Sequence, residues 1–187
     1  FEDTSNSASF ATNDWQITIN ESDNGGLEKF SIDDVTGNKT PLTIEAGASS
    51  HSLYIDDGGR LGLGTNTPAL HIHLVDGDSP KLRLEQDGSS GWSPQTWDLA
   101  GNEANFFIRD TSNGNTLPFR IRPGAPTSAI DIAADGDIGM GTDTPAKDLH
   151  IKSAAADEPV TVRLEAQTGD IWDIAADANG LTIAKGN

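Results

Sequence analysis

The chain has 187 residues and carries 12 Lys and Arg against 29 Asp and Glu, so its formal net charge is −17. This charge argues against a nucleic-acid partner and against docking on anionic lipid, because both need cations to neutralise phosphates. The lack of Cys excludes disulfides and thiolate metal sites, and no apolar run approaches the roughly 18 residues of a membrane-spanning helix, so membrane insertion is not expected.

Short segments in which apolar and polar residues alternate recur along the chain, and such alternation is typical of half-buried strands. In chain order these predicted strands lie at 15–19, 30–32, 42–44, 53–55, 82–84, 119–121 and 130–132. Clusters of Asp, Asn and Gly separate them, as at 57–59 and 134–137, and these residues tolerate the positive φ of tight hairpin turns. No long window carries a helical stripe. The sequence therefore predicts an all-β fold of repeated short strands and hairpins.

One unit of the sequence recurs. LGLGTNTP at 61–68 returns as IGMGTDTP at 138–145, an offset of 77 residues. Three further matches keep the same order: PLTI with PFRI (41–44 and 118–121), LRLE with VRLE (82–85 and 162–165) and WDLA with WDIA (97–100 and 172–175). LHI at 70–72 aligns with LHI at 149–151 after a two-residue insertion, which places Lys152 at the position of His73.

The repeat predicts how the chain is organised. We expect about two and a half units: a partial first β-repeat at 1–68, a second at 69–145 and a truncated third at 146–187. Serial repetition of this length favours stacking along an axis over one closed globule.

Strong core formers are sparse. Ile, Leu, Val and Phe together make up 39 of the 187 residues, close to the roughly 20% below which disorder is suspected in a highly charged chain. The apolar residues are nonetheless regularly placed. We therefore expect an ordered chain that completes its core with other copies of itself.

The order of the motifs resembles a known family. A strand ending in GLGTNTP or GMGTDTP, followed by LHI and later by LRLE, is similar to the GIGT-x-x-P … LHV repeats of phage tail fibres and bacterial secreted surface proteins. Repeats of this family often precede an intramolecular-chaperone domain. The segments 1–22, 40–65 and 97–110 look like a family of secreted bacterial proteins. The resemblance implies an elongated homotrimer, a β-prism or β-helix-like fibre or stalk, that is extracellular, at a cell surface or on a virion tail fibre. The number three comes from the resemblance alone.

Glycine alternates with apolar residues in both copies of the GxGT segment. Glycine inside a strand marks the close approach of another backbone. The absence of GxGxxG and of a following Lys argues against a phosphate-binding loop. We expect the trimer interior to be formed by Leu61, Leu63, Ile138 and Met140, with Gly62, Gly64, Gly139 and Gly141 permitting close backbone approach.

Two groups of residues are candidate metal ligands. His71 and His73 lie on one face of a predicted strand, and in a trimer their six nitrogens could surround an axial transition-metal ion, as an HxH does in trimeric phage needles. Alternatively, the intervening apolar residues face inward and both imidazoles are solvated. Asp135 and Asp137 offer oxygens to calcium, although Asp-Gly is also common in hairpin turns and the EF-hand spacing is absent. We expect no other cofactor.

Aromatic and basic residues suggest ligand contacts. Trp92 lies in a polar loop, where it could stack on a sugar ring or pack against a neighbouring subunit. Arg120 and Arg122 could hold an anionic glycan. Arg83 and Arg163 recur in LRLE and VRLE, which favours cross-strand or inter-subunit ion pairs. The recurrent Trp15, Trp97 and Trp172 favour packing.

These observations favour a non-catalytic structural segment that self-assembles as a homotrimer. No GxSxG motif is present, and we do not expect an enzyme. The alternative is a carbohydrate-binding adhesin that recognises glycans, with Trp92 as the leading anchor. A second alternative is a polysaccharide-degrading, tailspike-like enzyme, because a glycosidase carboxylate pair is recognised only in three dimensions.

Overall fold

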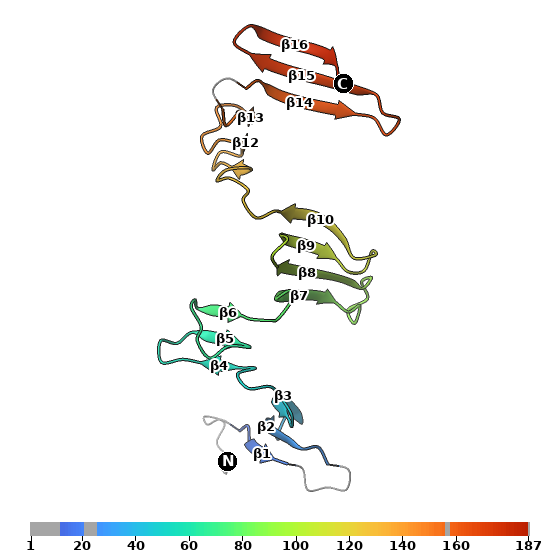
Figure 1. Ribbon diagram of the computed structural model, residues 1–187. Coiled ribbons are helices and arrows are strands. Elements are labelled where there is room, and N and C mark those ends of the chain that lie inside the picture. The colour runs from blue at the N-terminus through green and yellow to red at the C-terminus, as the bar shows by residue number, and fades with distance from the viewer. Residues whose placement is uncertain (1–11, 21–25, 156–157, 187) are drawn as a thin grey trace. The chain divides into compact units, whose positions relative to one another are not determined.

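A computed structural model describes residues 12–20, 26–155 and 158–186 (Figure 1). These residues form sixteen strands in five sheets and no helix, so the prediction of an all-β fold is confirmed. Within the described ranges, no helix is long and apolar enough to cross a membrane. The chain divides into two compact units, Phe1–Leu82 and Arg83–Asn187, which are described separately.

The N-terminal sheet is an antiparallel meander of β1 (Trp15–Ile19), β2 (Lys29–Asp34) and β3 (Lys39–Glu45). Its register places Ile17 opposite Ile32 and Ile32 opposite Leu42, so that the apolar residues share one face. The opposite face is polar. There the Asp33 carboxylate accepts hydrogen bonds from the hydroxyls of Thr18 and Thr40 at 2.6 and 2.8 Å.

Two small three-stranded sheets have the same topology. The first contains β4 (Tyr54–Ile55), β5 (Leu61–Leu63) and β6 (Ile72–Leu74); the second contains β11 (Asp131–Ile132), β12 (Ile138–Met140) and β13 (Leu149–Ile151). In each, the central strand pairs antiparallel with the first strand and parallel with the third. A parallel pair ordinarily needs a crossover of about a dozen residues, whereas here residues 64–71 suffice because Gly64 turns the chain at φ 80°.

Two further antiparallel sheets belong to the second half of the chain. The four-stranded sheet contains β7 (Lys81–Gln86), β8 (Gln95–Gly101), β9 (Phe106–Asp110) and β10 (Thr116–Ile121), and the boundary between the units falls within β7. The C-terminal sheet contains β14 (Val160–Glu165), β15 (Ile171–Asp177) and β16 (Gly180–Lys185). Pro118 lies at a bulge in β10, an edge strand, where its missing N–H costs no ladder hydrogen bond.

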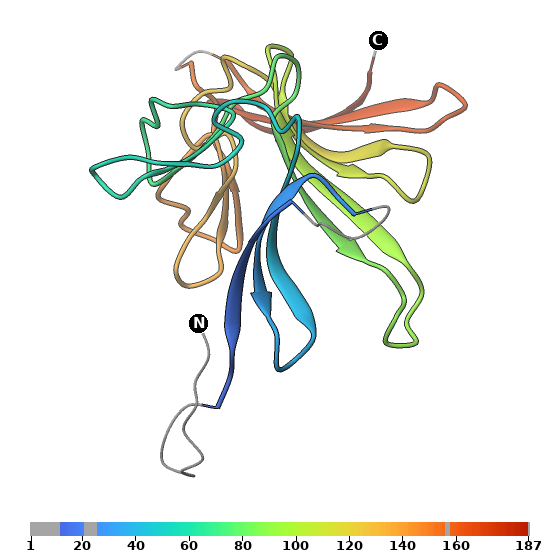
Figure 2. The same ribbon diagram turned by 90° about the horizontal axis from the view of Figure 1, so that it is seen from below.

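The described residues bury very little apolar side chain. Among the described residues, Ala100 and Phe107 are the only buried hydrophobic residues, whereas 29 large hydrophobic residues are exposed. Within each unit the strands contact chiefly the neighbours with which they hydrogen-bond. No helical segment of the described chain covers a sheet, and each sheet is a single layer with loops projecting from its strand ends (Figure 2).

The repeat boundaries expected from the sequence fall inside the small sheets. The 68/69 boundary separates β5 from β6, and the 145/146 boundary separates β12 from β13, although each of these strand pairs is hydrogen-bonded. These boundaries show where one copy of the sequence repeat ends and the next begins, and they do not coincide with breaks between sheets.

Candidate functional site

Each of the larger sheets presents one apolar face that the described chain leaves uncovered. In the C-terminal sheet, Val162 lies opposite Ile174, and Ile174 lies opposite Ile183, which is 63% exposed. The four-stranded sheet has a face of the same kind, formed by Leu84, Trp97, Leu99, Ile108, Phe119 and Ile121. These uncovered apolar faces are the feature that we consider first as a partner-binding surface.

The small sheets continue this pattern. Leu61 pairs with Ile55 on one side and Ile72 on the other, and Leu63 pairs with Leu74. The second small sheet repeats the arrangement through Ile138, which lies between Ile132 and Leu149, and through Met140, which pairs with Ile151. The four residues expected in a trimer interior therefore lie on exposed or half-buried apolar faces. Their contact with another chain remains a prediction.

The glycines of the GxGT segments have close neighbours in their own chain. A Cβ on Gly62 would overlap the carbonyl oxygen of Thr65, and one on Gly139 would overlap that of Thr142. Gly64 and Gly141 adopt φ of 80° and 79°, and a Cβ there would overlap the carbonyl oxygens of Val75 and Lys152. Close backbone approach thus explains all four glycines without a second chain.

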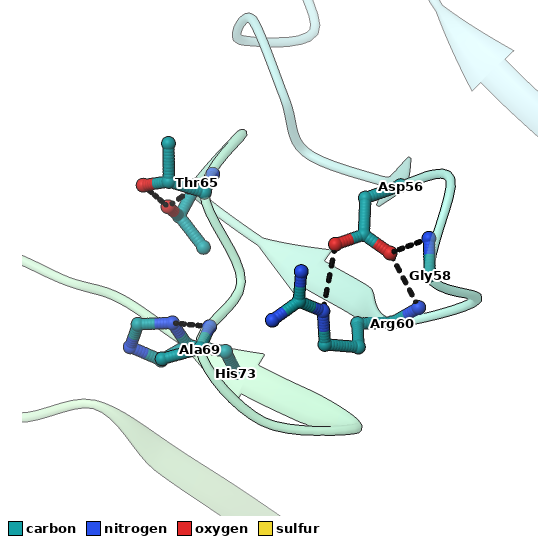
Figure 3. Close-up of polar contacts among 7 residues, drawn as sticks. Asp56, Gly58, Arg60, Thr65, Ala69 and His73 are labelled. Carbon is teal, nitrogen blue, oxygen red and sulfur yellow. Dashed lines mark hydrogen bonds and ion pairs between the residues drawn. The ribbon is translucent and has the colours of Figure 1, made fainter.

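His73 anchors the crossover loop of the first small sheet. Its Nδ1 accepts a hydrogen bond from the backbone N–H of Ala69 at 3.2 Å (Figure 3). His150 accepts the same bond from Ala146 at 3.3 Å in the second small sheet.

These bonds correct the sequence alignment of the repeat. Gly62 pairs with His73 and Gly139 pairs with His150, so the offset of 77 residues continues through β6 and β13 without an insertion. The counterpart of His73 is therefore His150, and the expectation of Lys152 at that position is wrong. The match between the two LHI segments is a coincidence of three letters. When the strands are aligned by their pairing, these two segments lie two residues out of register with each other. The additional residues lie after β13, in the linker 152–159.

The two predicted metal sites can now be placed. His71 precedes β6 and corresponds to Asp148, so only His73 of the HxH pair has a histidine counterpart. Asp135 and Asp137 lie in the turn between β11 and β12, where the N–H of Asp137 donates to Asp135 Oδ1 at 3.2 Å. In the described part of the chain, no group of three or more His, Asp or Glu side chains is arranged to hold a metal ion.

The β4–β5 and β11–β12 turns share a backbone but carry different charges. Asp56 Oδ1 accepts from the N–H groups of Gly58 and Arg60, and its Oδ2 accepts from Arg60 Nε at 2.8 Å (Figure 3). The Arg60 backbone N–H, followed by its side chain, lowers the pKa of Asp56. Asp137 occupies the position of Arg60 in the second turn, where desolvation, and then Asp135 and Asp148, raise its pKa.

The predicted glycan-binding residues do not form one site. Trp92 lies in the loop between β7 and β8 and is 71% exposed. Arg120 lies in β10, and Arg122 directly follows that strand. Because β10 runs in the same direction as β8, Arg122 lies at the end of the sheet opposite to the Trp92 loop. Any role for Trp92 is therefore separate from a role for the arginines.

The predicted ion pairs form across strands. Arg83 donates from Nε to Asp98 Oδ1 at 2.8 Å and from Nη2 to Asp98 Oδ2 at 3.0 Å. Arg163 makes the same two bonds to Asp173, both at 2.9 Å. The hydrogen-bonded Arg163 lowers the pKa of Asp173. The recurrent LRLE and VRLE motifs thus have a cross-strand role within one chain.

The recurrent tryptophans are only partly packed within the chain. Trp15 and Trp172 are exposed, and Trp97 is half-buried. All three lie on the apolar faces of their sheets, so their rings add to the uncovered surface. Comparison with protein-family models and with curated proteins finds no match for the chain.

Proposed function

We propose that the chain is a non-catalytic structural segment of an extracellular fibre or stalk and that it self-assembles as a homotrimer. The observation that carries the proposal is the near absence of a core. Ala100 and Phe107 alone are buried among the described hydrophobic residues, while the apolar face of every sheet is open.

The exposed area is large enough to require partners. The chain has an accessible surface of 14,476 Å², whereas a compact monomer of 19.7 kDa would expose about 8,600 Å². An interface between two units of one chain buries only about 600–1,500 Å², which is too little to account for the difference. Obligate assemblies bury about 2,000–5,000 Å² or more, so association on that scale supplies the missing burial.

Other copies of the same chain are the occupant that the pattern favours. The residues at Leu61 and Leu63 recur as Ile138 and Met140, on sheets with the same register. Identical chains in register would bring equivalent apolar faces together along the whole repeat, which no single unrelated partner does without a repeat of its own. Three single-layer sheets turned inward form a prism whose polar faces remain in water. The number three and the extracellular location rest on the resemblance to tail-fibre-like repeats.

The mass of the chain in solution tests this proposal. We expect light scattering at micromolar concentration to give three times the mass of one chain. Ile183→Asp should reduce that mass to one chain, because it puts a carboxylate on the apolar face of the C-terminal sheet. The matched control is Thr182→Asp, one residue along β16 on the opposite face, which should leave the trimer intact.

The two variants separate assembly from folding. Both positions are exposed in the single chain, so a monomeric protein would tolerate both substitutions equally. A wild-type chain that remains a well-ordered monomer at these concentrations, or an Ile183→Asp variant that keeps the wild-type mass, contradicts the proposal.

A further inference from the structure

The four-stranded sheet differs from the rest of the chain in its charge. Residues 81–122 contain five cations and five carboxylates and are neutral, so the remainder carries the whole charge of −17. Four of the six arginines of the chain belong to this segment: Arg83, Arg109, Arg120 and Arg122. An arginine-rich surface in so acidic a chain calls for an explanation.

The register gathers three of these arginines on one face. Asp98 lies opposite Arg109, and Arg83 binds Asp98 from β7, so these three side chains form a row across the sheet. The next row contains Ala100, Phe107 and Arg120. With Asp98 and Glu85 against Arg83, Arg109 and Arg120, this part of the face has a net positive charge. It is the face opposite the exposed apolar one.

Arg109 and Arg120 retain unused hydrogen-bonding capacity. The Arg109 guanidinium carbon lies 4.9 Å from the centre of the Phe107 ring, which is a cation–π contact. Its Nε is buried without a hydrogen-bond partner, as is the hydroxyl of Thr111 two residues further on. Among the described residues Arg120 and Arg122 form no ion pair with a carboxylate.

The backbone positions of the two arginines suit an acidic polymer. Arg120 is diagonal to Arg109 across adjacent strands, where Cα atoms are about 7–8 Å apart, and the buried Phe107 is a neighbour of both. Arginine binds carboxylates through two parallel hydrogen bonds. Arg120 and Arg122 are exposed, so an extended chain with repeated acidic groups can contact both, whereas a small molecule needs a pocket.

We propose that the polar face of the four-stranded sheet binds a uronate-containing polysaccharide through Arg109, Arg120 and Arg122. Arg83 is occupied by Asp98 and serves to hold that carboxylate away from the ligand. The negative charge elsewhere does not prevent binding, because charges beyond about 8 Å are screened at physiological ionic strength. This binding is independent of assembly, since Arg120 and Arg122 are exposed in a single chain and this face would point outward in the proposed prism.

Calorimetric titration of the whole chain with hexagalacturonate, at physiological salt, tests the proposal. We expect hexagalacturonate to bind and the neutral maltohexaose not to bind. Arg120→Gln with Arg122→Gln should weaken binding by about tenfold or more, since each charge-assisted hydrogen bond contributes appreciably. Both side chains are exposed, so the fold should be kept.

The matched control removes two cations elsewhere. Lys147→Gln with Lys152→Gln changes the net charge equally, at exposed positions just before and just after β13, and should alter the affinity by less than about twofold. Equal weakening by both double variants, equal binding of a phosphate-bearing oligonucleotide, or no binding of hexagalacturonate overturns the proposal. Binding by a sample of single-chain mass supports it and contradicts the trimer, so the two proposals can fail separately.

Discussion

Arg83 and Asp98 are joined by two parallel hydrogen bonds between adjacent strands, and Arg163 and Asp173 repeat this pair in the C-terminal sheet. The two pairs have the same geometry but different burial. The Asp98 side chain is 2% exposed, whereas that of Asp173 is 22% exposed. The arginines are equally accessible, so the comparison isolates the environment of the carboxylate.

This difference predicts unequal effects of the same substitution. Arg83→Gln removes two charge-assisted hydrogen bonds from a buried carboxylate and should lower the free energy of unfolding by clearly more than Arg163→Gln does. Arg163→Gln should have the smaller effect, because water solvates the more exposed Asp173 when its partner is lost. Urea denaturation of both variants gives the comparison. Equal losses would show that the burial of Asp98 has no energetic consequence.

The glycine of each GxGT strand is predicted to be irreplaceable within its own chain. Gly62→Ala and Gly139→Ala push a methyl group into the backbone carbonyls of Thr65 and Thr142, which cannot move as a flexible side chain could. Overpacking of this kind costs about 1–3 kcal/mol. Gly77→Ala is the control, since nothing lies within 4 Å of its Cβ position.

Thermal unfolding measures these effects. Gly77→Ala should be neutral or slightly stabilising because it restricts the unfolded chain. If the glycines were required only for contact between chains, Gly62→Ala would change the oligomeric mass and leave the stability of an isolated chain unaltered. We expect the loss of stability to appear whatever the mass of the sample.

The two histidines that accept hydrogen bonds from the crossover loops, His73 and His150, should have the same structural role. Loss of a hydrogen-bond acceptor leaves the N–H of Ala69 or Ala146 without its partner and costs about 1 kcal/mol. His73→Ala and His150→Ala should each accelerate hydrogen exchange of the corresponding alanine amide. His71→Ala should leave the exchange of Ala69 unchanged. Equal acceleration by His71→Ala and His73→Ala would instead favour a joint role for the HxH pair.

Sequence reasoning predicted local strands better than it predicted pairing. Alternation placed the first strand at residues 15–19, and β1 has these bounds because neighbouring side chains alone determine such a pattern. The parallel pairing of β5 with β6 depends on a turn at Gly64 and a return of the chain at Val75, which no local pattern contains. The same limit explains the misplaced alignment of His73.

The candidate sites show the same division. The cross-strand arginine pairs were predictable because each motif recurs with its Asp on the next strand. The sequence predicted only part of the arginine face, because Arg120 and Arg122 are close in sequence whereas Arg109 is brought near them only by the strand register. The sequence could not predict that Phe107 is buried and Phe106 exposed, because two adjacent phenylalanines give no indication of which face of the strand is covered.

Asp137 is predicted to destabilise the fold at neutral pH. Its pKa is raised in the folded chain, first by desolvation and then by Asp135 and Asp148. A carboxyl group with a raised folded pKa opposes folding once the pH exceeds its unfolded value, about 3.9. Asp137→Asn should therefore raise the melting temperature at pH 7, and the gain should vanish as the pH falls below that value, where the carboxyl is protonated in both states.

At the equivalent turn, the charged carboxylate of Asp56 has the opposite effect on the stability of the fold. Its pKa is lowered, chiefly by the backbone N–H of Arg60, so its contribution to stability is present at neutral pH and is lost as the pH falls through the lowered pKa. Asp56→Asn should thus lower the melting temperature at pH 7 while Asp137→Asn raises it. Melting curves between pH 3 and pH 7 decide the matter: a gain from Asp137→Asn that persists at the lowest pH cannot arise from the charge of that carboxylate.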